Sequence, residues 1–157
     1  MAGGLLLLAA GCGYRPLHAA KGDVRSISVS IFENRTHLPA VEGVLADALT
    51  DELAYRGRRV VREGELLLKG KVLSYAVKPA SYSAADLAVE YRAQLRVEAV
   101  VVETASGKQV WKRELVAERV FPAHDVPVLQ RRGEEEAVRV MCREIAGTLF
   151  VGLTEDF

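Results

Sequence analysis

Alternating apolar and polar residues predict the first β-strand of this chain. Over residues 24–32, Ile27, Val29 and Ile31 would share one face, and serine residues would occupy the other. Valines in the sequence RRVV at residues 58–61 predict a second, short strand. A helical segment lies between the two, and this strand–helix–strand order favours a right-handed parallel crossover.

The clearest alternation lies in the middle of the chain. Residues 65–83 predict a long strand, bent at Gly70 or ended by Pro79. The turn-forming sequence TASGK at 104–108 separates the next two strands, which predicts a hairpin. In the strand before this turn, one face is apolar, with Val89, Tyr91, Ala93, Leu95, Val97, Ala99 and Val101, and the other is polar, with Glu90, Arg92, Gln94, Arg96 and Glu98.

Two segments show the three- and four-residue apolar spacing of amphipathic helices. The first begins near Val41, with Pro39 suited to its first turn and Gly57 to its end. Its apolar stripe comprises Val44, Leu45, Ala48, Leu49 and Leu53. The second spans 133–153 and would begin with three glutamates, which favour a helix N-terminus. Its apolar stripe comprises Val138, Met141, Cys142, Ile145, Leu149 and Leu153.

These elements predict an α+β fold. Two amphipathic helices can cover the apolar face of the sheet, which gives a two-layer sandwich. The two helices would pack on one face of a four- to five-stranded, mainly antiparallel (mixed) sheet. The other, polar face of the sheet is then left to solvent or to a partner.

The first residues of the chain are typical of a bacterial lipoprotein signal. The apolar run Leu5 to Ala10 is far shorter than the about 20 residues that a membrane-spanning helix needs. The run ends in the small residues Ala9 and Ala10, Gly11 follows, and then comes Cys12, which we expect to be lipidated. The alternative is a chance cysteine in an apolar tail. We therefore expect a removed signal peptide at 1–11, a lipidated N-terminus and tether at 12–23, and a single domain at 24–157.

Charge and cysteine content narrow the possible functions. The chain has 21 Lys and Arg against 21 Asp and Glu, so it carries no net charge. A nucleic-acid-binding protein normally has a basic face and a raised pI, so no nucleic-acid partner is expected. With Cys12 lipidated, Cys142 has no cysteine partner for a disulfide.

No catalytic motif stands out. The three histidines lie in the predicted tether and loops, without metal-ligand spacing, so neither a metal nor another cofactor is expected. Cys142 lies on the apolar stripe of the second helix, where a role in the core is favoured over that of a nucleophile. The sequence therefore predicts a protein that is not an enzyme.

The polar face of the central strand has two interpretations. Arg92 and Arg96 could bind an anionic ligand, helped by Lys69 and Lys71 on the neighbouring strand. Alternatively, the charges pair across the hairpin, in a register that also places Ala99 opposite Trp111. The pairs in that register would be Glu98 with Lys112, Arg96 with Glu114 and Arg92 with Glu118.

Four segments in order resemble the LptE family of lipopolysaccharide-assembly lipoproteins. They are AAGCGYRPL, FENRTHLPAVEGVLADALTDELAYRG, LLLKGKVLSYAVKPASYS and YRAQLRVEAVVVETASGKQVW, which together cover nearly the whole chain. The resemblance implies a lipid anchor at Cys12 in the outer membrane, on the periplasmic side. It also implies a plug role inside an LptD-like outer-membrane β-barrel, binding of lipopolysaccharide, and no catalysis. The alternative function is that of an auxiliary lipoprotein of an envelope ABC transporter.

Overall fold

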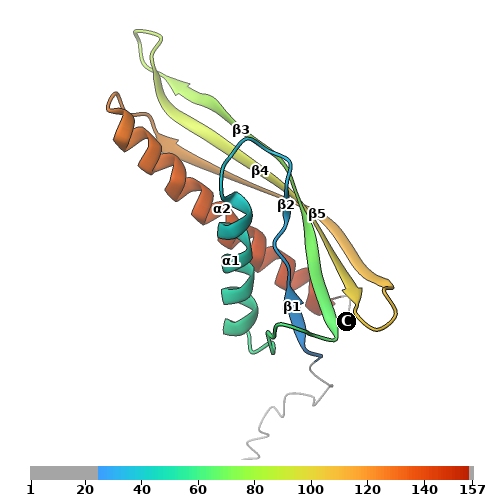
Figure 1. Ribbon diagram of the computed structural model, residues 1–157. Coiled ribbons are helices and arrows are strands. Elements are labelled where there is room, and N and C mark those ends of the chain that lie inside the picture. Colours follow the sequence, from blue (N-terminus) through green and yellow to red (C-terminus); the bar gives the residue numbers. More distant parts are fainter. Residues whose placement is uncertain (1–24, 156–157) are drawn as a thin grey trace, which may run out of the picture.

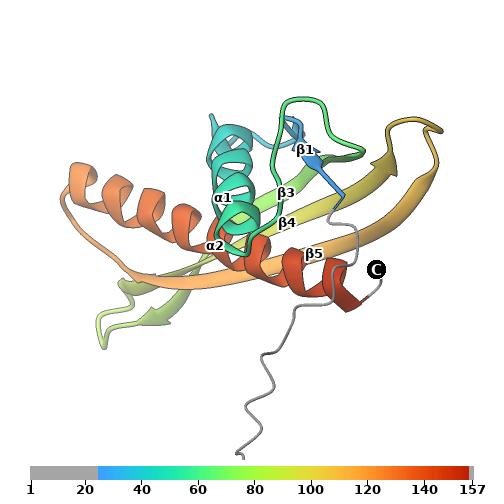
Figure 2. The same cartoon turned by 90° about the horizontal axis from the view of Figure 1, so that it is seen from below.

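The computed structural model describes residues 25–155, which form a two-layer α+β fold. A long twisted sheet makes one layer, and both helices pack against the same face of it (Figures 1 and 2). No helix in this range has both the length and the apolar character needed to cross a membrane. Cys12 and the predicted signal peptide and tether lie outside the described residues.

The sheet is mixed, as the sequence predicts. Strands β3, β4 and β5 pair antiparallel in that order, whereas β1 and β2 both pair parallel with β3. The elements in chain order are β1 (Ile27–Val29), β2 (Glu33–Asn34), α1 (Val41–Tyr55), β3 (Leu66–Tyr82), β4 (Ala88–Glu103), β5 (Gln109–Pro122) and α2 (Pro127–Glu155).

The core lies between the helices and the sheet. The face of β4 that the alternation predicts as apolar is fully buried from Ala93 to Val101, and it packs against the helix stripes. All six residues of the predicted α2 stripe are buried, Cys142 among them, so this cysteine is a core residue. Gly57 ends α1 with a φ of 77°, a conformation that glycine adopts without strain.

The first strand is shorter than predicted. It breaks after Val29, and Ile31 is 73% exposed although the alternation places it on the core face. Phe32 is buried instead, because the ring lies over Gly70 of β3, where no side chain competes for the space. Burying the larger aromatic ring outweighs continuing the strand.

The predicted second strand at 58–61 is wrong. Only Val60 forms an isolated parallel bridge, with Ile27. The chain then passes Gly64, where the backbone of Ile27 and Ser28 lies so close that a Cβ would clash. The parallel crossover nevertheless exists, since α1 connects β1 to β3.

The predicted start of the second helix is displaced, whereas the first helix begins at Val41 as predicted. Helix α2 begins at Pro127, which suits the first helical position, so the three glutamates lie inside the helix rather than in its first turn. Gly133, the predicted start, is an interior residue of α2 that lies against the Phe121 ring. Helix α1 begins at Val41 after Ala40, so Pro39 precedes the helix.

Candidate functional site

The face of the sheet that the helices leave uncovered carries the candidate site. We call it the open face. It is contributed by alternate residues of β3, β4 and β5, and all four cations that the sequence singles out lie on it: Lys69, Lys71, Arg92 and Arg96. Sheet periodicity alone therefore places these residues on one surface.

A β-bulge in β3 brings a further cation, Lys78, onto the open face. The register between β3 and β4 shifts between Val72 and Ser74, so one extra residue is inserted there. Lys78 lies an odd number of positions after Lys71, which faces away from the helices. Without the extra residue, Lys78 would therefore face the helices. Lys78 instead lies opposite Arg92. Sequence reasoning missed it, because strict alternation cannot reveal a bulge.

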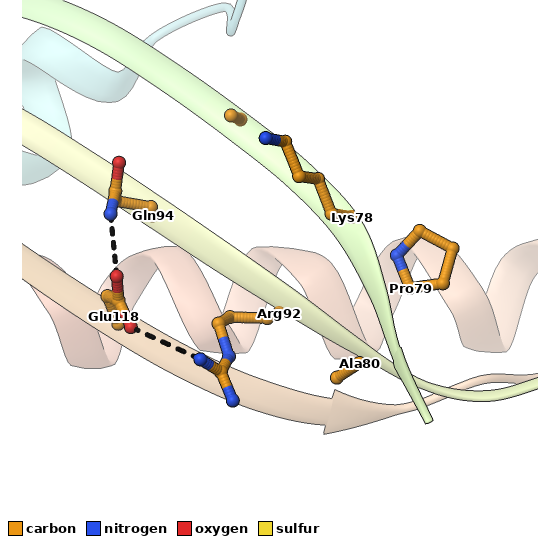
Figure 3. Close-up of a pocket in the computed structure, with 7 residues that line it drawn as sticks. Lys78, Pro79, Ala80, Arg92, Gln94 and Glu118 are labelled. Carbon is orange, nitrogen blue, oxygen red and sulfur yellow. Dashed lines mark hydrogen bonds and ion pairs between the residues drawn. The ribbon is translucent and has the colours of Figure 1, made fainter. Parts of the chain in front are cut away.

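Lys78 and Arg92 line one groove on the open face, near the β3–β4 hairpin (Figure 3). The groove has a volume of about 450 Å³, and Pro79, Gln94 and Glu118 also line it. The Arg92 guanidinium lies 3.8 Å from a Glu118 oxygen, and Gln94 donates a 2.6 Å hydrogen bond to the same carboxylate. Lys78 forms no ion pair with any residue in the described range, so its charge is free to bind an anion.

Lys69 and Lys71 line a second groove, of about 640 Å³, nearer the β4–β5 turn. Lys112 enters it from β5 and contacts the Glu98 carboxylate at 2.8 Å. The hydrogen bond from Lys112, with help from the charge of Lys71, lowers the pKa of Glu98. This groove holds three lysines against Glu98 and Glu33, so its positive charge is partly neutralised.

The cross-strand ion pairs predicted for the hairpin form, although the predicted register is wrong. Arg96 contacts Glu114 at 2.8 Å, and the two other pairs, Arg92 with Glu118 and Glu98 with Lys112, are present as well. Ala99, however, lies opposite Arg113 rather than Trp111, a shift of two residues. The three pairs are therefore diagonal, which remains within reach of long side chains.

The ion pairs divide the cations of the open face into two kinds. Arg96 is held by a short hydrogen-bonded pair, whereas the Arg92 pair is long. Lys69, like Lys78, has no ion pair within residues 25–155. The part of the open face best able to bind an anion is therefore the groove that joins Lys78 to Arg92.

No metal site is seen in the described range. No group of three or more His, Cys, Asp or Glu side chains there could hold a metal ion. His37 and His124 are exposed loop residues, far apart in the sequence. The chemistry that the open face offers is ionic and hydrogen-bonded recognition of a ligand.

The fold is shared with solved lipoprotein structures. Rare lipoprotein B from Shewanella oneidensis is 14% identical, with a TM-score of 0.58 over 83% of this chain and 94% of that chain. A minor lipoprotein from Acinetobacter baumannii is 19% identical, with a TM-score of 0.54 over 79% of this chain and 86% of that chain. At these identities the likeness establishes the fold alone.

Sequence comparison identifies the family. A search of curated proteins finds no match. The family described as "LptE: Lipopolysaccharide-assembly" matches residues 24–151, which include every described helix and strand except the last turn of α2. The chain therefore belongs to the LptE family of lipopolysaccharide-assembly proteins.

Proposed function

We propose that this lipopolysaccharide-assembly protein is the plug subunit of an outer-membrane translocon, held inside an LptD-like β-barrel. A neutral, compact domain with one polar sheet face is suited to the polar lumen of a wide barrel. Its signal peptide would be residues 1–11, its lipidated tether 12–23 and its folded domain 24–157. Lipidation of Cys12 would hold it at the periplasmic side of the outer membrane, and no catalysis is required.

The observation that carries this proposal is the helix-free face with its exposed cations. Binding the phosphates of a lipopolysaccharide headgroup requires positively charged hydrogen-bond donors. A chain with no net charge must concentrate such donors in one place. The Lys78 and Arg92 groove is lined by an ammonium from β3 and a guanidinium from β4, the latter turned toward Glu118 of β5 (Figure 3). Lys69, Lys71 and Arg96 extend the positive face toward the other end of the sheet.

Removal of the two cations in this groove tests the binding site. In the double variant Lys78→Gln and Arg92→Gln, we expect lipopolysaccharide affinity to fall about tenfold or more, since charged hydrogen bonds are worth about 1.5–3 kcal/mol each. Binding of fluorescent lipopolysaccharide to the purified full chain measures this, alongside the melting temperature. The melting temperature should hardly change, because the Arg92 ion pair is exposed.

The matched control lies on the other side of the sandwich. Arg139 and Arg143 are exposed cations of α2, so Arg139→Gln with Arg143→Gln removes the same charge away from the open face. This control should keep its affinity for lipopolysaccharide. Equal affinity in the groove variant and the parent chain would show that lipopolysaccharide binds elsewhere.

Purification from native membranes tests the partner. The full chain should co-purify with an outer-membrane β-barrel protein, and the complex should survive the groove substitutions if the cations serve the ligand rather than the barrel. An envelope transporter in place of the barrel would contradict the plug role.

A further inference from the structure

The loop between α1 and β3 concentrates positive charge. Four arginines fall within residues 56–62, which we call the arginine loop. Arg56 pairs with Glu52 of α1 at 3.0 Å. The other three, Arg58, Arg59 and Arg62, form no ion pair with any residue between 25 and 155. Arg59 and Arg62 are exposed, so their guanidinium groups are available to a partner.

Backbone hydrogen bonds fix the arginine loop beside the start of β1. The N–H of Ile27 donates to the Arg59 carbonyl at 2.9 Å, and the N–H of Val61 donates to the Ile27 carbonyl at 3.0 Å. The N–H of Arg58 also donates to Leu53 of α1 at 2.9 Å. The arginines are therefore presented from a held backbone.

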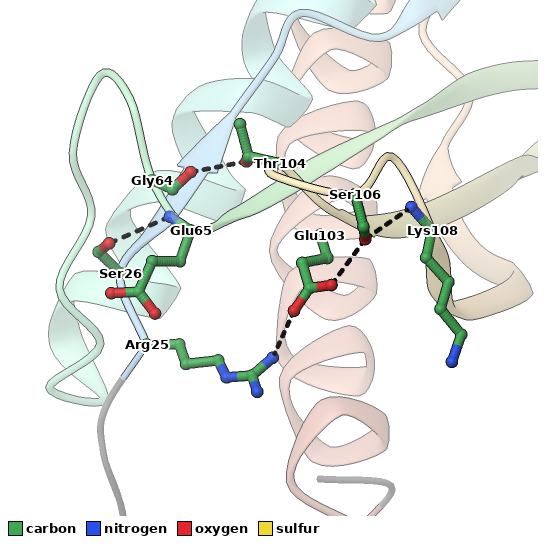
Figure 4. A network of polar contacts seen from close by, with 8 residues as sticks. All are labelled: Arg25, Ser26, Gly64, Glu65, Glu103, Thr104, Ser106 and Lys108. Atoms are coloured by element: carbon green, nitrogen blue, oxygen red, sulfur yellow. Dashed lines mark hydrogen bonds and ion pairs between the residues drawn. The ribbon is translucent and has the colours of Figure 1, made fainter.

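The same end of the molecule receives the N-terminal segment. Arg25, the first described residue, reaches Glu103 at 3.5 Å, and Ser26 accepts a hydrogen bond from the N–H of Glu65 (Figure 4). The 24 residues that precede Arg25 therefore enter the described domain just before Ile27. Ile27 is the residue whose backbone hydrogen-bonds to the arginine loop. An anchor at Cys12 would be separated from this end of the domain by 12 residues.

Charge in this part of the sequence is one-sided, although the whole chain is neutral. Residues 12–25 and 56–65 together hold seven Arg and Lys but three Asp and Glu. Of the nearby carboxylates, Glu103 is engaged by Arg25 and by Ser106, whose hydroxyl lies 2.6 Å away. Glu63 and Glu65 oppose the arginines in part, and a positive excess remains.

We propose that the arginine loop docks on the anionic phospholipid headgroups of the membrane to which the chain is anchored. Guanidinium groups match phosphate oxygens well, and arginines close to an anionic surface are attracted to it. This attraction fades beyond about 10 Å at 0.1 M salt, so the arginines must approach the surface closely, and the loop lies beside Ile27 at the start of the described domain. The inference rests on the proposed membrane anchoring but not on lipopolysaccharide binding.

Vesicle binding tests the proposal with the full chain carrying Cys12→Ser, so that no acyl chain contributes. The vesicles are phosphatidylcholine alone, or phosphatidylcholine with phosphatidylglycerol at about one part in three. We expect stronger binding to the anionic vesicles, and weaker binding as salt is raised. The triple variant Arg58→Gln, Arg59→Gln and Arg62→Gln should lose about tenfold or more of this binding.

The control removes the same charge at the other end of the sheet. Arg119, Arg131 and Arg132 lie on the end of β5 and the start of α2, far from the arginine loop (Figure 1). Their replacement by glutamine should leave vesicle binding nearly unchanged. A triple replacement of the arginine loop by lysine should also keep most of the binding, because charge is what the surface attracts.

Three results would overturn the proposal. They are equal binding of the loop variant and the parent chain, equal losses in the loop variant and the control, and an absence of binding to anionic vesicles at low salt. An absence of binding to anionic vesicles would instead indicate that the loop binds an acidic protein surface. Circular dichroism verifies folding, and the lysine variant tests charge if the glutamine variant unfolds. Because the vesicles contain no lipopolysaccharide, failure here is distinct from failure of the proposed function.

Discussion

Glu98 is the residue of the open face whose ionisation the structure perturbs most clearly. Lys112 donates to its carboxylate at 2.8 Å, and Lys71 adds positive charge from the neighbouring strand. Both effects favour the ionised form, so the pKa of Glu98 is below its ordinary 4.5. A folded-state pKa lower than the unfolded one stabilises the fold at neutral pH, and this contribution is lost as the pH falls through the folded value.

Replacing Lys112 by methionine should therefore raise the pKa of Glu98 toward 4.5. A carboxyl-detected NMR titration measures the change. Lys108→Met is the control, because Lys108 lies at the β4–β5 turn and takes no part in this pair. The stability difference between the parent chain and Lys112→Met should be present at pH 7 and vanish in acid. An unchanged pKa would mean that the ion pair does not form in solution.

At the scale of the elements, β3 determines where its neighbours can lie. Two other segments approach Gly70 closely, because the Phe32 ring and the Glu98 carbonyl oxygen occupy the space that a Cβ would take. Farther along, the bulge between Val72 and Ser74 turns the rest of the strand, so that Lys78 reaches the open face. One strand thus controls both the packing of Phe32 and the composition of the candidate site.

Gly70→Ala should destabilise the protein by roughly 3 kcal/mol, because the added methyl group must displace backbone or an aromatic ring. Chemical denaturation measures the free energy of unfolding. The matched control is Gly43→Ala in α1, where nothing lies within 4 Å of the new methyl group. This control should instead stabilise by about 0.5–1 kcal/mol, the helix preference of alanine over glycine. If Gly70→Ala did not lower the free energy of unfolding relative to Gly43→Ala, Phe32 would not pack over Gly70.

At the scale of the whole molecule, the two layers enclose Cys142. Its side chain has no exposed surface, and burial raises the pKa of the thiol to about 12. The cysteine lies on α2 within the single core cluster that both helices and the sheet share. Access to it requires the layers to separate, so its reactivity reports on the fold as a unit.

In the full chain with Cys12→Ser, we therefore expect Cys142 to react with a thiol reagent at pH 8 at least about 1000-fold more slowly than an exposed thiol, because labelling needs an opening of the core that costs about 5 kcal/mol or more. The rate should rise with urea in step with global unfolding. Introducing Ala80→Cys at an exposed position of β3 gives the control, in which a second thiol reacts at once. Fast labelling of Cys142 in native buffer would contradict a single cooperative core.

Local patterns in the sequence determined most of the elements and their faces, with the segment 58–61 and Ile31 as exceptions. The helix stripes and the alternation of β4 identify the core side of each element, because burial imposes the periods 3.6 and 2 directly on the residues. The same alternation was sufficient to place Lys69, Lys71, Arg92 and Arg96 on one surface. The family resemblance could likewise be read from the sequence, and the match over residues 24–151 confirms it.

The tertiary structure decided what periodicity cannot distinguish. Moving β5 by two residues keeps every side chain on its own face, so alternation fits both registers, and only the pairing selects Ala99 opposite Arg113. The bulge that brings Lys78 beside Arg92 and the choice of Phe32 over Ile31 for the core depend on contacts between distant segments. Such contacts leave no period in the sequence, because they form only when the strands meet.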